Sequence, residues 1–179
     1  MVPKYDEPKF KQLLHLVAAA IADHPSAGAV KLNKVLYYAE FGQYRDTGVA
    51  ISGAEFVHRR MGPTPYRLLP VRSSMIDEGL LKLEVRELGP GMEEHRLSPA
   101  GQMTYDLLSP EEISRVRLVA EELRPLSASG VSARSHLDAG WRTTFDGETI
   151  PYDAVFMDAP QHITAKTRER LIAAETKLS

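Results

Sequence analysis

The first pattern of apolar and polar positions begins at Phe10 and continues at Leu13, Leu14, Val17 and Ile21. Intervals of three and four residues predict an amphipathic helix over residues 8–23. The run His24-Pro25-Ser26 should end this helix, because the residue before a proline resists helical geometry.

A second helix is expected from about Ala29 to Arg45, and it carries two neighbouring apolar stripes. One stripe consists of Leu32, Val35, Leu36 and Ala39, and the other of Tyr37, Phe41 and Tyr44. A helix with two apolar stripes is covered from more than one side. We therefore expect this helix at the centre of the core.

The next segment is more broken. Residues 54–60 are short and mixed, and we interpret them as a strand, whereas Gly62-Pro63-Thr64-Pro65 should interrupt regular structure. Helical spacing returns over residues 66–78. Because Pro70 is tolerated only in the first turn, this third helix should start near Leu69.

A strict alternation follows, with Leu81, Leu83 and Val85 between Lys82, Glu84 and Arg86. It predicts a half-buried strand, which Gly89-Pro90-Gly91 connects to a partner strand over residues 93–97. A helix followed by such a hairpin resembles a winged-helix unit with the hairpin as its wing. The expected fold class is α+β, mainly α-helical, with a small β-hairpin wing.

Capping signals mark the second half of the chain. Ser98 and Ser109 each precede a proline, so both are predicted N-caps, and Glu112 completes a capping box with Ser109. Further helical pieces are expected at 131–137 and 152–157. A charged helix over 164–177 closes the chain, and we interpret residues 1–179 as a single domain.

Composition narrows the classes of function. Lys and Arg number 22 against 24 Asp and Glu, so the net charge of −2 gives no global argument for nucleic-acid binding. The chain has no cysteine, and its charged first ten residues lack the apolar core of a signal peptide. We expect a soluble cytoplasmic protein without a membrane span.

Catalytic and metal-binding patterns are weak. The histidines never pair at the i, i+4 spacing of a helical zinc motif, and Ser135-His136-x-Asp138 offers triad residue types only as sequence neighbours. No glycine-rich phosphate loop opens a helix. The sequence therefore predicts no catalytic residue, no metal site and no cofactor, and we expect that the protein is not an enzyme.

One basic segment is a candidate partner-binding site. It contains Arg59, Arg60, Tyr66, Arg67 and Arg72 and no acidic residue. The plainest interpretation is a solvated face. An acidic protein partner ranks close behind it, because Arg and Tyr are favoured interface anchors, and DNA ranks a distant third. Trp141, the sole tryptophan, is interpreted first as a core residue and second as an interface anchor.

Three stretches together resemble the Panacea, or SocA-like, antitoxin family over residues 28–157. They are the helix K-L-N-K-V-L-Y-Y at 31–38, the extended segment and G-P-T-P turn at 51–65, and an S-H-x-x-x-x-W element at 135–141 followed by I-P-Y at 150–152. The residues that carry the resemblance are Lys31, Leu32, Lys34, Leu36, Tyr37, Gly62, Pro63, Pro65, His136, Trp141, Pro151 and Tyr152.

The resemblance implies a bacterial or phage protein that is encoded beside a toxin and neutralises it by direct contact. The family motifs are not catalytic, and the target of the toxin is not inherited from them. A protease or chaperone that receives the bound toxin is a further candidate partner. The competing hypothesis is a winged-helix-like DNA-binding transcription regulator. The sequence leaves the binding surface and the oligomeric state open.

Overall fold

The computed structural model describes residues 3–157, and the helix expected at 164–177 lies outside them. The helices are α1 (Glu7–Ala20), α2 (Ala29–Thr47), α3 (Leu68–Asp77), α4 (Pro110–Leu123), α5 (Ala128–Ser135), α6 (Ala139–Arg142) and the 3-10 helix η1 (Tyr152–Phe156). The strands are β1 (Phe56–Val57), β2 (Thr64–Pro65), β3 (Leu81–Gly89) and β4 (Met92–Pro99). These elements confirm the predicted class, α+β and mainly helical.

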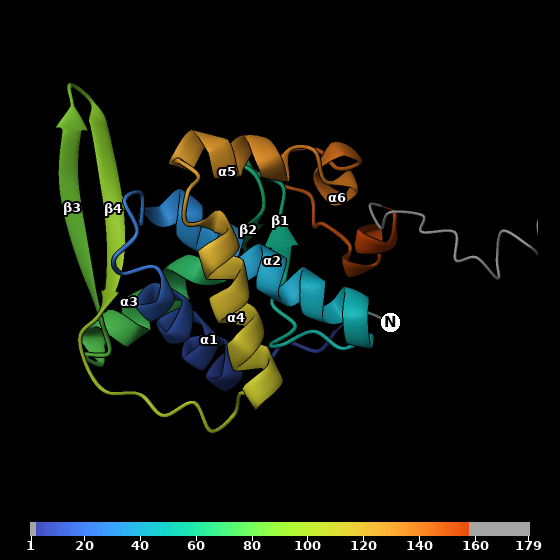
Figure 1. Cartoon of the computed structure of the whole chain (residues 1–179), viewed down its shortest axis with the longest axis horizontal. Coiled ribbons are helices and arrows are strands. Elements are labelled where there is room, and N and C mark those ends of the chain that lie inside the picture. The colour runs from blue at the N-terminus through green and yellow to red at the C-terminus, as the bar shows by residue number, and fades with distance from the viewer. Residues whose placement is uncertain (1–2, 158–179) are drawn as a thin grey trace, which may run out of the picture.

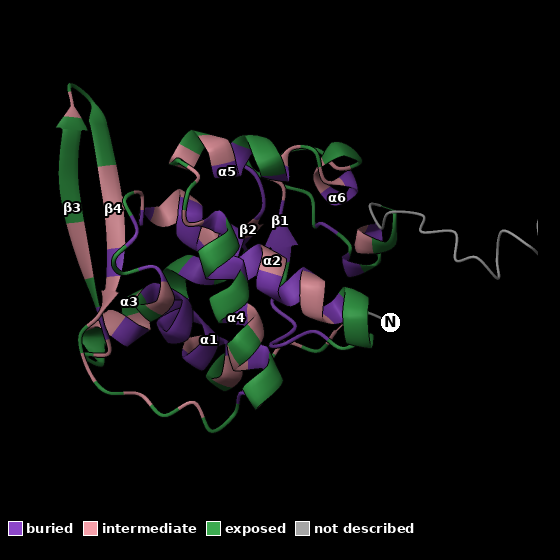
Figure 2. Cartoon of the chain, viewed as in Figure 1, coloured by how far each residue is buried: buried purple, intermediate pink, exposed green. Residues whose placement is uncertain are grey.

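Helix α2 occupies the centre of the structure, as its two apolar stripes predict (Figure 1). It packs against α1, α4, α5 and η1. Figure 2 shows buried residues along most of its length, up to its exposed last turn at 45–47. Tyr37 and Phe41 of the second stripe contact each other and Phe56 of β1, which gives the core an aromatic centre.

Helix ends differ from the expectations by a few residues. Helix α1 ends at Ala20, three residues before the predicted end, and Arg96 of β4 donates hydrogen bonds to the carbonyl oxygens of Ala22 and His24. These bonds satisfy carbonyl groups just after the end of α1, which have no partner within the helix. Helix α2 runs two residues further than expected and ends at Thr47, and its C-cap Gly48 has a left-handed φ of 76°.

The two serine N-caps have different outcomes. The capping box of Ser109 and Glu112 at the start of α4 is confirmed, with both reciprocal hydrogen bonds present. The N-cap predicted at Ser98 is wrong, because Ser98 pairs with Lys82 and Pro99 with Leu81 in the β3–β4 hairpin. A proline is tolerated at the end of a strand, so a Ser-Pro pair is no sufficient helix signal here.

The strands form two antiparallel pairs. Thr64–Pro65, which we expected to interrupt regular structure, pairs as β2 with β1 at Phe56–Val57. The second pair is the predicted hairpin, β3–β4, and it follows α3 as a wing would. In Figure 1 β4 lies toward the helices and β3 on the outside of the structure. Contacts of β4 with α1 and α2 hold the hairpin against the helical body.

Candidate functional site

Two lysines of α2 lie inside the protein, and each binds a backbone carbonyl. Lys31 Nζ donates to the carbonyl oxygen of Arg124 at the C-cap of α4, 3.1 Å away. Lys34 Nζ donates to the carbonyl oxygen of Pro63, 2.9 Å away. Burial lowers the pKa of Lys34 to about 7, and the charge of Asp138 opposes this shift. Leu32 and Leu36 of the same motif are core residues.

The turn that Lys34 binds requires glycine at position 62. Gly62 has a φ of 94°, and a Cβ there would lie 2.3 Å from Ser135 Oγ and 2.6 Å from Lys34 Cε. Ser132 of α5 donates its hydroxyl to the Met61 carbonyl. The lysine of α2 and the serines of α5 therefore enclose the turn from two sides, and no larger side chain fits between them.

The S-H-x-x-x-x-W element forms a three-ring stack. The ring of Trp141 lies between His136, with ring centroids 3.9 Å apart, and His58, with centroids 4.4 Å apart. Trp141 Nε1 donates to the carbonyl oxygen of Arg59 at 3.2 Å. Burial lowers the pKa of His136, and the charge of Lys34 acts in the same direction. The stack attaches α6 to the segment that follows β1.

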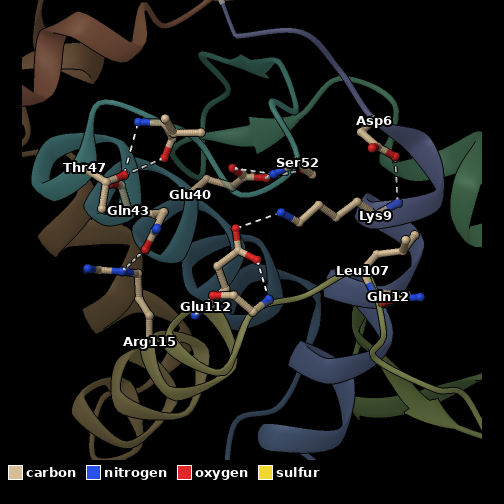
Figure 3. A network of polar contacts seen from close by, with 12 residues as sticks. Asp6, Lys9, Gln12, Glu40, Gln43, Thr47, Ser52, Leu107, Glu112 and Arg115 are labelled. Atoms are coloured by element: carbon tan, nitrogen blue, oxygen red, sulfur yellow. Dashed lines mark hydrogen bonds and ion pairs between the residues drawn. The ribbon is translucent and has the colours of Figure 1, made fainter.

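The last motif residues cover the opposite end of α2. Tyr152 stacks on Phe41 with centroids 4.4 Å apart, and its hydroxyl donates to the Ala54 carbonyl at 2.7 Å. Beside it Glu40 is fully buried and points at Ser52, as Figure 3 shows. Ser52 donates its backbone N–H, 3.0 Å away, and its hydroxyl to the Glu40 carboxylate. Burial raises the pKa of Glu40 to about 7, although these donors lower it.

Each motif with a sequence resemblance thus contributes mainly to packing. Pro63, Pro65 and Tyr37 are buried, and Pro151, which is exposed, starts η1 as its N-cap. Trp141 is half-buried, so it is neither a full core residue nor an open surface anchor. The polar motif side chains bind backbone carbonyls across long sequence separations. That arrangement holds loops and short helices onto α2.

The structure separates the basic segment into two groups. Arg59 and Arg60 are exposed in the loop after β1, where Arg59 lies 3.9 Å from Asp146. Arg67 is the N-cap of α3, and its guanidinium lies over the ring of Tyr5, 5.4 Å from the centroid. Arg72 of α3 is only partly exposed, and its Nε is buried without a hydrogen-bond partner in the described region. The arginines therefore do not align along the exposed face of α3.

Exposed apolar residues accompany the first group. Leu137 before α6 is 72% exposed and Phe145 after α6 is 77% exposed. Tyr66 is 61% exposed, but it lies beside Glu55, at the other end of β1. The loop of Phe145 lies beside the loop of Arg59, since Gly147 donates its N–H to the His58 carbonyl. We call this region the α6 surface. Its exposed residues include Arg59, Arg60, Met61, Leu137, Arg142 and Phe145, together with the acidic Asp146 and Glu148 of the same loop. In the sequence, residues 138–145 gave only Asp138 of the triad-like group and Trp141 as candidate residues.

The triad-like residues of α5 have structural partners. Ser135 is fully buried and donates its hydroxyl to the Ser132 carbonyl, and the ring of His136 lies against Trp141. Within residues 3–157, no group of three or more metal-ligating side chains comes together. No helix in that range has both the length and the apolar character needed to cross a bilayer.

Comparison with known proteins gives one family. The sequence model described as "Antitoxin SocA-like, Panacea domain" matches residues 32–142, which is more than half of the chain. Neither the curated proteins nor the solved structures gave a significant match. The matched range holds the lysine at 34, the turn at 62–65 and the His136–Trp141 element, whereas Lys31, Pro151 and Tyr152 lie outside it. The chain belongs to the SocA-like antitoxin family and carries its Panacea domain.

Proposed function

We propose that this protein is the antitoxin of a toxin–antitoxin system, and that it neutralises a cognate protein toxin by direct binding and not by catalysis. The family match over residues 32–142 carries this proposal. The packing role of the motif residues supports it, because the buried network builds a rigid scaffold whose exposed loops are free to differ between relatives. The encounter takes place in the cytoplasm of a bacterium or of a phage-infected cell.

The α6 surface is our proposed toxin-binding site. It combines arginines with exposed Leu137 and Phe145, and Arg and aromatic residues are enriched among the side chains that carry binding energy. Trp141 and His136 hold its two loops together from beneath. A rigid surface loses less conformational entropy on binding than a loose one. The complementary toxin surface should place acidic groups opposite the arginines, around an apolar centre.

The remaining residues of the basic segment differ in how accessible they are to a toxin. Tyr66 is exposed and open to a partner. Arg67 is exposed but already lies over Tyr5, so its use by a toxin would compete with that contact. Arg72 is the weakest candidate, because part of its guanidinium group is buried. We therefore place the main contacts at Arg59, Arg60 and Phe145.

Co-expression tests the proposal. The product of the neighbouring gene is expressed alone and with this protein, and growth rescue and co-purification are scored. We expect toxicity alone, and rescue together with a stable complex. A harmless neighbour, or rescue without a complex, would remove the direct-binding mechanism and make DNA binding by the winged-helix-like region the next hypothesis.

Variants locate the surface. Replacing Arg59 and Arg60 by Glu, or Phe145 by Ala, should weaken the complex at least about tenfold. Arg117→Glu on α4 and Val49→Ala after α2 are matched controls, since both residues are exposed elsewhere. If the controls weaken binding as strongly as the α6 variants, the toxin binds another surface.

The fate of the toxin distinguishes occlusion from removal. If the antitoxin only blocks the toxin, the amount of toxin stays constant while growth recovers. If a protease or chaperone is a second partner, the half-life of the toxin shortens when the antitoxin is present. A chase experiment after stopping protein synthesis measures this half-life directly.

A further inference from the structure

The β3–β4 hairpin has one covered edge and one open edge. An antiparallel bridge joins Arg96 of β4 to Gly28, and the side chain of Arg96 also binds carbonyls of the α1–α2 connection. Among the described residues, β3 pairs only with β4. Its other edge faces away from the helical body, as Figure 1 shows. The backbone groups along that edge are open to a further strand.

The outer part of the hairpin lacks the support that such ribbons need. Val85 is 54% exposed, and Leu88 and Met92 are more exposed still. Figure 2 shows β3 exposed over most of its length. An isolated two-stranded ribbon is only marginally stable in water, and three or more strands are needed for independent stability. An additional strand along β3 would supply that support.

The charges along β3 determine which strand fits. Two antiparallel copies of β3 centred on Val85 place Glu84 of each copy opposite Arg86 of the other. The same register places Val85 opposite Val85 and Leu88 opposite the aliphatic stem of Lys82. Opposite charges directly across an antiparallel pair stabilise it, and like charges destabilise it. The two-fold arrangement repeats each favourable pair twice.

Neighbouring registers are worse. A pairing centred on Glu84 places Glu84 against Glu84 and Lys82 against Arg86, and a pairing centred on Arg86 places Arg86 against Arg86. Within one chain Glu84 already lies 3.3 Å from both Lys82 and Arg86, but these are exposed pairs that contribute little. They remain free to form additional contacts across an interface. A pairing centred on Leu83 also brings opposite charges together, Lys82 with Glu84, but it leaves Arg86 opposite Leu80. Only the register centred on Val85 pairs Glu84 with Arg86.

We propose that β3 joins two copies of this chain into a homodimer, with the strand order β4-β3-β3-β4 and Val85 on the two-fold axis. The two helical bodies lie at the two outer edges of the four-stranded sheet, because in each chain β4 lies between the helical body and the β3–β3 interface. The contact is an isologous one, as closed dimers require. It is small, so we expect a weak dimer with a dissociation constant in about the micromolar range. The dimer does not depend on the antitoxin function.

Charge reversal tests the register. Sedimentation equilibrium of the full chain at about 5–300 µM should show a monomer–dimer equilibrium. Glu84→Arg and Arg86→Glu should each raise the dissociation constant at least about tenfold, because each replaces two attractive pairs by two repulsive ones. The double variant E84R/R86E should restore the wild-type constant. An equal mixture of the two single variants should also dimerise, since it restores both charge pairs between unlike chains.

Lys82→Glu is the matched control, because it reverses an exposed charge on the same strand opposite an apolar residue. Its dissociation constant should change by less than about threefold. Circular dichroism and thermal unfolding check that each variant is folded, and the mixture shows that each single variant retains a competent hairpin. A monomeric wild type at all concentrations overturns the proposal. So does a dimer that survives both single reversals, or a mixture that stays monomeric.

Discussion

Lys34 Nζ on α2 donates a hydrogen bond to the carbonyl oxygen of Pro63, 2.9 Å away in the interior of the protein. The side chain of Lys34 is fully buried. A buried carbonyl without a partner costs free energy, so the lysine has a structural role as a donor. Its ammonium group is also costly to bury, which is why the pKa of Lys34 falls to about 7.

Lys34→Met should change how stability depends on pH. The pKa of Lys34 is about 7 in the folded protein and 10.5 in the unfolded chain. Between these pH values the unfolded state therefore binds more protons than the folded state. The free energy of unfolding of the wild type should therefore rise by up to about 2 kcal/mol from about pH 7 to pH 9. In the methionine variant this rise should be largely lost, and urea unfolding measured at each pH records it.

The methionine variant should also be less stable at pH 9 by about 1–3 kcal/mol, since the Pro63 carbonyl loses its donor. Lys82→Met, on the exposed hairpin, is the control and should keep the wild-type slope. If Lys34→Met retains the full rise with pH, the buried lysine is not the titrating group.

Gly62→Ala should destabilise the protein strongly. The new Cβ would lie 2.3 Å from Ser135 Oγ, and the φ of 94° disfavours any L side chain. We expect a loss of about 2–4 kcal/mol in the free energy of unfolding. Gly48→Ala is the matched control, because Gly48 has a φ of 76° with no atom within 4 Å of the added Cβ. It should cost only about 1 kcal/mol, so equal losses would contradict the steric argument.

Local patterns predict much of this fold. The two stripes of α2 predict its central place, the alternation over residues 81–86 predicts the hairpin, and Ser109-Pro110 with Glu112 predicts the start of α4. Each signal depends on residues close together in the sequence. The same local logic was wrong at Ser98, where pairing with β3 decides the conformation. It also missed β2, because a two-residue strand exists only through its partner β1.

The site was less predictable for a related reason. The motif lysines and Gly62 were recognisable as a set, but their partners are 29 and 93 residues away in the sequence. No local pattern states that a lysine will bind a carbonyl at the end of another helix. The basic segment appeared continuous in the sequence, yet β2 and the turn before it separate Arg59 from Arg67. Backbone hydrogen bonds between His58 and residues 147 and 148, formed only in the folded chain, bring the loop of Phe145 beside Arg59.

Glu40→Gln should remove a second pH dependence. Burial raises the pKa of Glu40 from 4.5 to about 7, so the folded protein binds more protons than the unfolded chain between these values. The contribution of Glu40 to stability is full below about pH 4.5 and is lost as the pH rises through 7, by up to about 3 kcal/mol. The difference in unfolding free energy between wild type and Glu40→Gln should therefore decrease over this range.

The difference is the quantity to measure, because His24 acts in the opposite direction. Burial lowers the pKa of His24, so its protonation in acid favours the unfolded chain. That contribution is common to both proteins and cancels. Glu93→Gln in the exposed hairpin is the control and should run parallel to the wild type. A Glu40→Gln profile that also runs parallel would show that the Glu40 carboxyl does not titrate in this range.

Trp141 offers a test of structure against recognition. Its ring lies between His58 and His136, and its Nε1 donates to the Arg59 carbonyl. Trp141→Phe keeps an aromatic ring in the stack but loses the hydrogen bond, which should cost about 1 kcal/mol. Trp141→Ala removes the stack as well and should cost about 2–3 kcal/mol. Circular dichroism must follow the unfolding, since Trp141 is the only tryptophan.

The same variants separate two roles in toxin binding. If Trp141 acts by positioning the loop of Arg59, as its contacts imply, Trp141→Phe should bind the toxin within about threefold of the wild type, because the stack still holds the loop. Arg59→Glu should then lose at least about tenfold with little change in stability. Calorimetric titration against the toxin measures both. A phenylalanine variant that is stable but loses as much affinity as Arg59→Glu would show instead that the indole itself contacts the toxin.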